Sequence, residues 1–155
     1  MIGTELGDWR RTIYSSQLDP SMDGKEVVVM GWISSVRDHG NLVFVLLNDK
    51  EGQMQITAKA GVCPDEIKES LVKLKEQSTI AVKGVIKPSA KAPRGVEISP
   101  SELRVFSVVE KIAPFQWQTK TVPNIDTRLE LRAIDLRRNI LQHVFKMRSL
   151  VLKSI

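Results

Sequence analysis

Hydrophobic and polar residues alternate in short stretches along the first two thirds of the chain, and this pattern predicts β-strands. Turn-forming residues such as Asp, Gly and Asn separate the stretches. The predicted strands span residues 25–37, 42–47, 53–58 and 78–86, and a fifth spans 96–98 and 103–109 with an interruption near Pro100. Gly31, inside the first strand, predicts a bulge or a sharp bend.

A helical pattern replaces the alternation between the third and fourth strands. Pro64 is followed by two acidic residues, which favour the first turn of a helix, and Ile67, Leu71 and Leu74 then recur at helical spacing. Three strands, a helix and two further strands is the order of an OB-fold, an all-β, five-stranded Greek-key barrel. An SH3-like barrel also has five strands, but the helix in this position favours the OB-fold.

The last third of the chain predicts helices after a linker. Residues 110–125 contain Pro114 and Pro123 and show little periodicity, whereas residues 127–138 and 139–155 look helical. We therefore expect an OB-fold domain over 1–110, a linker or hinge over 111–138, and a helix over 139–155. The apolar stripe of this helix runs to Ile155 without a Gly or Pro to end it, so we expect its partner surface to lie further along a longer natural chain.

Charge is concentrated near the end of the chain. The formal net charge is +5, and residues 126–155 carry seven basic and three acidic residues, so the predicted barrel is nearly neutral. If the barrel binds nucleic acid, it must use a local patch and specific base contacts rather than a general positive field.

Composition excludes several classes of protein. Cys63 is the only cysteine, so the chain cannot form an internal disulfide framework. The sequence contains only two histidines, His39 and His143, which is too few for a structural zinc site with a single cysteine. No apolar run is long enough to cross a membrane, and the N-terminus does not resemble a secretory signal. We therefore expect a cytoplasmic protein with no metal site.

Two stretches resemble one protein family. Residues 31–44 read GWISSVRDHGNLVF, followed by ND at 48–49 and GQMQ at 52–55, and this pattern resembles the anticodon-binding OB domain of class IIb aminoacyl-tRNA synthetases. Residues 126–138 read DTRLELRAIDLRR, which is similar to the segment that links this domain to the catalytic domain. The paired arginines favour the aspartyl branch, and the asparaginyl branch is the closest alternative. Asn48 departs from the family, which usually has arginine there.

The resemblance implies roles for four residues in reading an anticodon. Phe44 would stack on the central base, and Gln55 would read the central uridine. Glu97 would accept hydrogen bonds from the first anticodon base, and Arg37 would contact a base or a phosphate. The alternatives are core packing for Phe44, solvated strand positions for Gln55 and Glu97, and an ion pair for Arg37. Gln53 lies on the same predicted strand face as Gln55 and could be confused with it.

Two groups of basic residues each allow two interpretations. The loop residues Lys87, Lys91 and Arg94 suit the phosphate backbone of RNA, although a solvated charged loop is an equal alternative. The hinge arginines would either contact tRNA or hold two domains together through Asp126 and Asp135. These hinge residues are Arg128, Arg132, Arg137 and Arg138.

The resemblance implies a longer enzyme that activates aspartate with ATP and Mg²⁺ and charges tRNA-Asp, with tRNA-Asn as a further substrate to consider. Such enzymes form homodimers. No class II catalytic motif occurs in this sequence, so we expect no catalytic residue, no bound cofactor and no aminoacylation from this chain by itself. Two other functions remain open: a free-standing OB-fold for single-stranded nucleic acid, and an OB domain that binds protein.

Overall fold

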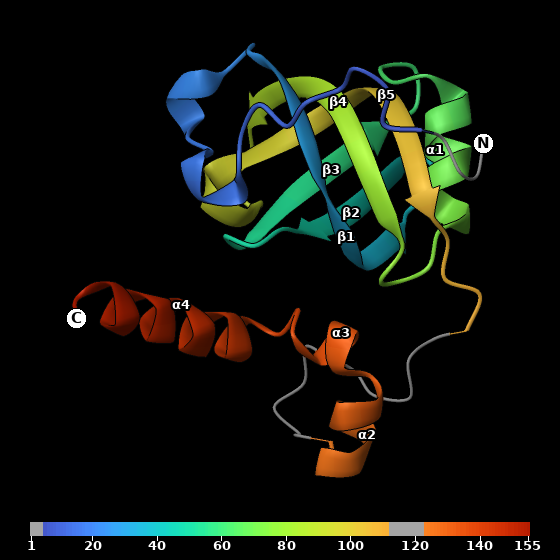
Figure 1. Cartoon of the computed structure of the whole chain (residues 1–155). Coiled ribbons are helices and arrows are strands. Elements are labelled where there is room, and N and C mark those ends of the chain that lie inside the picture. Colours follow the sequence, from blue (N-terminus) through green and yellow to red (C-terminus); the bar gives the residue numbers. More distant parts are fainter. Residues whose placement is uncertain (1–4, 112–122) are drawn as a thin grey trace. The chain divides into compact units, whose positions relative to one another are not determined.

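Five strands form a closed barrel in the first part of the chain (Figure 1). The computed structural model describes residues 5–111 and 123–155, and it divides into two compact units, Met1–Ile112 and Ala113–Ile155. The barrel order is β1-β2-β3-β5-β4, and β4 pairs back with β1. Only β3 and β5 pair in parallel. The strands are β1 (Glu26–Asp38), β2 (Leu42–Asn48), β3 (Gln53–Lys59), β4 (Thr79–Pro88) and β5 (Val96–Ser107).

The helix expected between the third and fourth strands is α1 (Asp65–Lys73). Its buried residues Ile67 and Leu71 pack with Leu74 into the barrel core. Inward-facing side chains from all five strands fill this core, including Ile33, Leu47, Met54, Ile56, Ile80, Ile86 and Ile98. The predicted five-stranded OB-fold with an inserted helix is therefore confirmed.

Two details of the strands differ from expectation. The fifth strand is continuous, because Pro100 lies opposite Gly84 next to a register shift that accommodates a residue without an N–H. In β1 the register shift lies between Ile33 and Ser35, not at Gly31. Gly31 instead permits a close approach of two strands, since a Cβ there would lie 2.1 Å from the backbone oxygen of Asn48.

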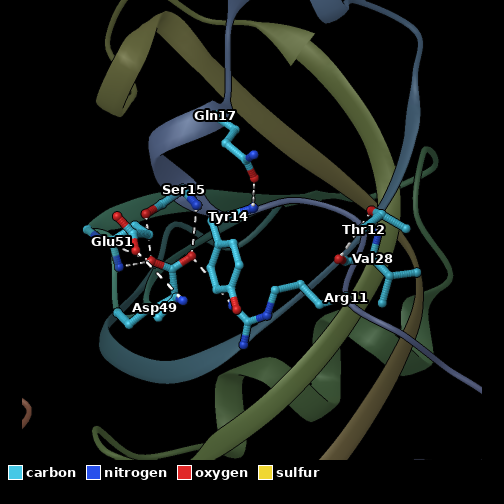
Figure 2. A network of polar contacts seen from close by, with 10 residues as sticks. Arg11, Thr12, Tyr14, Ser15, Gln17, Val28, Asp49 and Glu51 are labelled. Carbon is cyan, nitrogen blue, oxygen red and sulfur yellow. Dashed lines mark hydrogen bonds and ion pairs between the residues drawn. The ribbon is translucent and has the colours of Figure 1, made fainter. Parts of the chain in front are cut away.

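The N-terminal segment is held to the barrel by a polar network (Figure 2). The buried carboxylate of Asp49 accepts hydrogen bonds from the backbone N–H and the hydroxyl of Ser15, at 2.8 and 2.7 Å. It also accepts from the N–H groups of Glu51 and Gly52, at 2.7 and 3.0 Å. Arg11 lies 3.6 Å from the same carboxylate. The sequence predicted only irregular structure here, and the structure adds short 3-10 helices at Ser15–Gln17 and Pro20–Met22.

The described part of the second unit, residues 123–155, contains three helices, α2 (Ile125–Glu130), α3 (Arg132–Asp135) and α4 (Asn139–Lys153). The stretch 127–138, which looks helical in the sequence, holds two short helices, because Leu131 between them has φ −105° and ψ 39°, outside the helical region. On α4 the apolar stripe is exposed, with Ile140, Met147 and Leu152 each more than 60% accessible. Residues 112–122 of the predicted linker lie outside the described residues. In the described ranges, no helix is long and apolar enough to span a membrane.

We expect the substitution Asp49→Asn to lower the free energy of unfolding by about 2–4 kcal/mol, because an amide nitrogen would replace one of the oxygens that accept these hydrogen bonds. Urea denaturation followed by circular dichroism measures this change. Asp38→Asn is the matched control, since Asp38 accepts one exposed bond from Gly40, and its cost should stay below about 1 kcal/mol. Equal effects of the two substitutions would contradict the central role of Asp49.

We expect Gly31→Ala to cost roughly 1–3 kcal/mol, because the added methyl group would force β1 away from the backbone of Asn48. Thermal denaturation of the two proteins gives the comparison. Ser35→Ala, on the same strand, adds no atom and should change stability by less than about 0.5 kcal/mol. A Gly31→Ala protein as stable as the original would rule out the close approach.

Candidate nucleic-acid interface

A groove of about 640 Å³ lies on the outer surface of the barrel, lined by residues of all five strands, the β4–β5 loop and Val62. Strand alternation explains which side chains reach it. On β2, Val43, Val45 and Leu47 point into the core, so Leu42, Phe44 and Leu46 point outward into the groove. The same alternation brings Gln55, Thr57 and Lys59 of β3 and Glu97 and Ser99 of β5 to this surface.

The groove brings together six of the seven barrel residues that the sequence singled out. These are Arg37, Phe44, Gln55, Lys87, Lys91 and Glu97. Arg94 does not line the groove and is exposed in a short turn, Pro93–Gly95, where its φ of 59° lies in the left-handed region. The sequence missed Thr57 and Lys59, although both follow Gln55 at the two-residue spacing that keeps them on the same strand face.

Phe44 is half-buried and presents its ring to the groove. His39 packs edge-on against it, with ring centroids 5.8 Å apart and an interplanar angle of 72°. Phe44 is not a member of the barrel core cluster. Its position therefore disagrees with the alternative that it packs in the core. An aromatic ring with one accessible face is a surface on which an unpaired base can stack.

Gln55, Thr57 and Glu97 form a hydrogen-bonded group at the contact between β3 and β5. Gln55 and Glu97 are direct partners in the parallel pairing. Glu97 Oε2 accepts from Thr57 Oγ1 at 2.8 Å and from Gln55 Nε2 at 3.2 Å. Gln55 Nε2 also lies 3.2 Å from Thr57 Oγ1. Gln55 and Glu97 are therefore not simply solvated strand residues, because their side chains are hydrogen-bonded to each other.

Gln53 has a different environment, which separates it from Gln55. Its Nε2 donates to Asn48 Oδ1 at 3.0 Å and to Ser34 Oγ at 3.3 Å, and Gln53 does not line the groove. Asn48 is buried, with 3% of its surface accessible. The asparagine that departs from the family pattern is thus an acceptor for Gln53 inside the barrel wall.

The groove carries a local positive charge. Four basic side chains line it, Arg37, Lys59, Lys87 and Lys91, against the single acidic side chain of Glu97. Leu42, Leu46 and Val62 add apolar side chains to the lining. An aromatic ring, hydrogen-bonding groups and clustered cations are the combination that single-stranded nucleic acid requires: surfaces for bases, partners for their edges and charge for the phosphates.

The hinge arginines surround a buried carboxylate within the second unit. Asp135 is fully buried, and Arg128 Nε lies 3.2 Å from both of its oxygens. Arg132 and Arg138 approach it at 3.2 and 3.6 Å. Arg137 is half-buried, and this burial lowers the pKa of its guanidinium. Three of the four predicted hinge arginines thus pair with Asp135, inside their own unit.

Within residues 5–111 and 123–155, no group of three or more His, Cys, Asp or Glu side chains is placed to hold a metal ion. Cys63 is buried, and burial raises the pKa of its thiol. A protonated, buried thiol at neutral pH is a poor nucleophile.

Comparison with known proteins agrees with this geometry. Residues 27–106 match the family described as OB-fold nucleic acid binding domain. The chain is 45% identical over 147 residues to the aspartate–tRNA(Asp/Asn) ligase of Methanocaldococcus jannaschii and 43% identical over 150 residues to that of Methanothermobacter thermautotrophicus. These alignments cover 95% and 97% of the chain but only 34% of either relative, so the chain spans about a third of their length.

Among solved structures, the asparaginyl-tRNA synthetase of Pyrococcus horikoshii complexed with asparaginyl-adenylate is similar with a TM-score of 0.77 and 25% identity. The match covers 94% of this chain and 35% of that one. The aspartate–tRNA ligases are thus relatives that this chain resembles over about a third of their length. Because the family match covers more than half of the chain and includes every strand that builds the groove, this chain belongs to the family of OB-fold nucleic acid binding domains.

Proposed function

We propose that the groove binds the anticodon loop of tRNA-Asp and also that of tRNA-Asn. The observation that carries the proposal is the meeting of Phe44, the Gln55–Glu97 pair and four basic side chains in one groove. In the proposed complex the central base stacks on Phe44, and Gln55 and Glu97 contact base edges. Arg37 contacts a base or a phosphate, and Lys87 and Lys91 contact phosphates.

The inclusion of both tRNAs follows from the chemistry of their anticodons and from the relatives. The anticodons GUC and GUU share their first two bases and differ at the third, so Phe44 and Gln55 meet the same central uridine in each. The names of the methanogen relatives include both tRNAs. We expect the side chains that contact the third anticodon base to be residues other than Phe44, Gln55 and Glu97.

We further propose that the whole protein is a ligase that activates aspartate with ATP and Mg²⁺ and transfers it to tRNA. The support is the identity of 43–45% to aspartate–tRNA ligases over nearly all of this chain. The catalytic residues and the ATP site would lie in the two thirds of those relatives that this chain does not span. The homodimer that the resemblance implies would form through that same region.

We expect anticodon stem-loops bearing GUC and GUU to bind more tightly than a stem-loop with an adenine-centred anticodon, measured by fluorescence anisotropy at fixed salt. Phe44→Ala should weaken GUC binding roughly 10- to 100-fold, because base stacking on an aromatic ring contributes about 1–3 kcal/mol. Phe106→Ala is the matched control, since Phe106 is half-buried on β5 but outside the groove, and its effect should be small.

Other outcomes would favour the other functions. Equal affinity for all three loops, with sensitivity to Phe44→Ala, would indicate a general single-stranded nucleic-acid module. No binding to any loop would contradict an RNA-binding role for the groove and favour a protein-binding OB domain.

We expect Lys87→Ala and Lys91→Ala to weaken binding to all loops by the same factor, because phosphates carry no sequence information. Each substitution should also reduce the slope of log K against log salt by about 0.7, the value for one phosphate contact to a single strand. Lys73→Ala on α1, exposed and outside the groove, should leave the slope unchanged. A change in base preference without a change in slope would contradict phosphate contact.

A further inference from the structure

Thr57 occupies an unusual position for a residue of the groove, because it is only 6% accessible yet hydrogen-bonded to a partly exposed acid. The hydrogen bond between Thr57 and Glu97 lies where β3 pairs with β5. These two strands pair at only two positions, Gln55 with Glu97 and Ile56 with Ile98. Thr57 Oγ1 to Glu97 Oε2, at 2.8 Å, is the shortest bond of the group. The buried hydroxyl thus fixes one oxygen of the carboxylate.

The number of available protons determines the direction of each bond. An ionised glutamate only accepts, so the atom of Gln55 that faces Glu97 must be the amide nitrogen. The one proton of the Thr57 hydroxyl goes to Glu97, so the hydroxyl accepts from Gln55 Nε2. The amide nitrogen therefore directs its protons into this group, and the amide oxygen points away from it.

Two acceptors remain for a ligand. Among the described residues, none donates to Gln55 Oε1 or to Glu97 Oε1, and both side chains line the groove. A base edge that presents an N–H can pair with these oxygens, whereas a ring nitrogen with a lone pair would face another lone pair. At ring position 3, uracil presents a proton and cytosine presents a lone pair, whereas the donor of cytosine is the amino group on the neighbouring carbon. An oxygen acceptor that faces N3 therefore favours uracil over cytosine.

We propose that Thr57 is a positioning residue that holds Glu97 and, through it, the amide orientation of Gln55, so that the groove accepts a uracil edge and rejects a cytosine edge. This inference rests on the proposed function. Thr57 touches no base in this account and acts only through its two neighbours. Valine has nearly the same shape and strand preference but lacks the hydroxyl, so Thr57→Val removes the bond that fixes Glu97 Oε2, and with it the support of the Gln55 amide, while keeping the packing.

The test compares stem-loops with uridine and with cytidine at the central anticodon position, otherwise identical. We expect the wild-type chain to prefer uridine, Thr57→Val to lose about three- to tenfold of that preference, and Thr57→Ser, which keeps the hydroxyl, to retain it. The value measured is the ratio of the two dissociation constants. A uniform loss of affinity with an unchanged ratio would overturn the inference, because a merely structural role acts on both loops alike.

The two proposals fail in different ways. If the wild-type chain shows no preference for uridine, the proposed anticodon-reading function fails. If the wild-type chain prefers uridine and Thr57→Val keeps the full preference, only the positioning role fails.

A second measurement needs no RNA. The side-chain amide signals of Gln55 in a ¹H–¹⁵N spectrum should shift in Thr57→Val and stay in place in Thr57→Ser, because only valine removes the acceptor at Oγ1. Unchanged Gln55 signals in a folded Thr57→Val protein would overturn the inference. If Thr57→Val does not fold, a Thr57→Ser protein that has lost the wild-type uridine preference would overturn it as well.

Discussion

The carboxylate of Asp49 is the interaction on which the arrangement of the barrel wall depends. It sits at the turn between β2 and β3 with 2% of its surface accessible, and it accepts four hydrogen bonds from Ser15, Glu51 and Gly52. Two of these bonds shape the turn, and two attach a segment 34 residues earlier in the chain. Burial of a charge is tolerated only where several donors surround it. The β2–β3 turn and the N-terminal segment therefore depend on each other.

This turn sets the register that builds the groove. Asn48 pairs with Gln53, and the pairing continues so that Phe44 stands opposite Thr57 and Leu46 opposite Gln55. A slip by one residue would move every side chain of one strand to the other face, taking Phe44 into the core and Val45 outward. The shape of the groove thus depends on the geometry of a turn some distance away, because none of the Asp49 donors lines the groove.

Local patterns in the sequence were enough to predict the strands and α1, whereas the roles of Phe44, Gln55, Arg37 and Glu97 came from the resemblance to anticodon-binding OB domains. Local patterns could not predict contacts that depend on how distant strands meet. The role of Thr57 requires β3 to lie beside β5, 40 residues away, and the difference between Gln53 and Gln55 requires knowledge of Asn48 and Ser34. The helical pattern of residues 127–138 likewise did not reveal the break at Leu131 or the ion pairs of Arg128 and Arg132 with Asp135.

The near balance of basic and acidic residues outside the groove has a consequence for competition among RNAs. Residues 1–125 carry sixteen basic and fifteen acidic residues, so attraction to a polyanion fades within a Debye length of the groove. Ribosomal and messenger RNA outnumber any one tRNA in mass, and a strongly cationic domain would be occupied by them. A barrel of this kind leaves such bulk RNA largely unbound and stays available for the few loops whose splayed bases fit its surface.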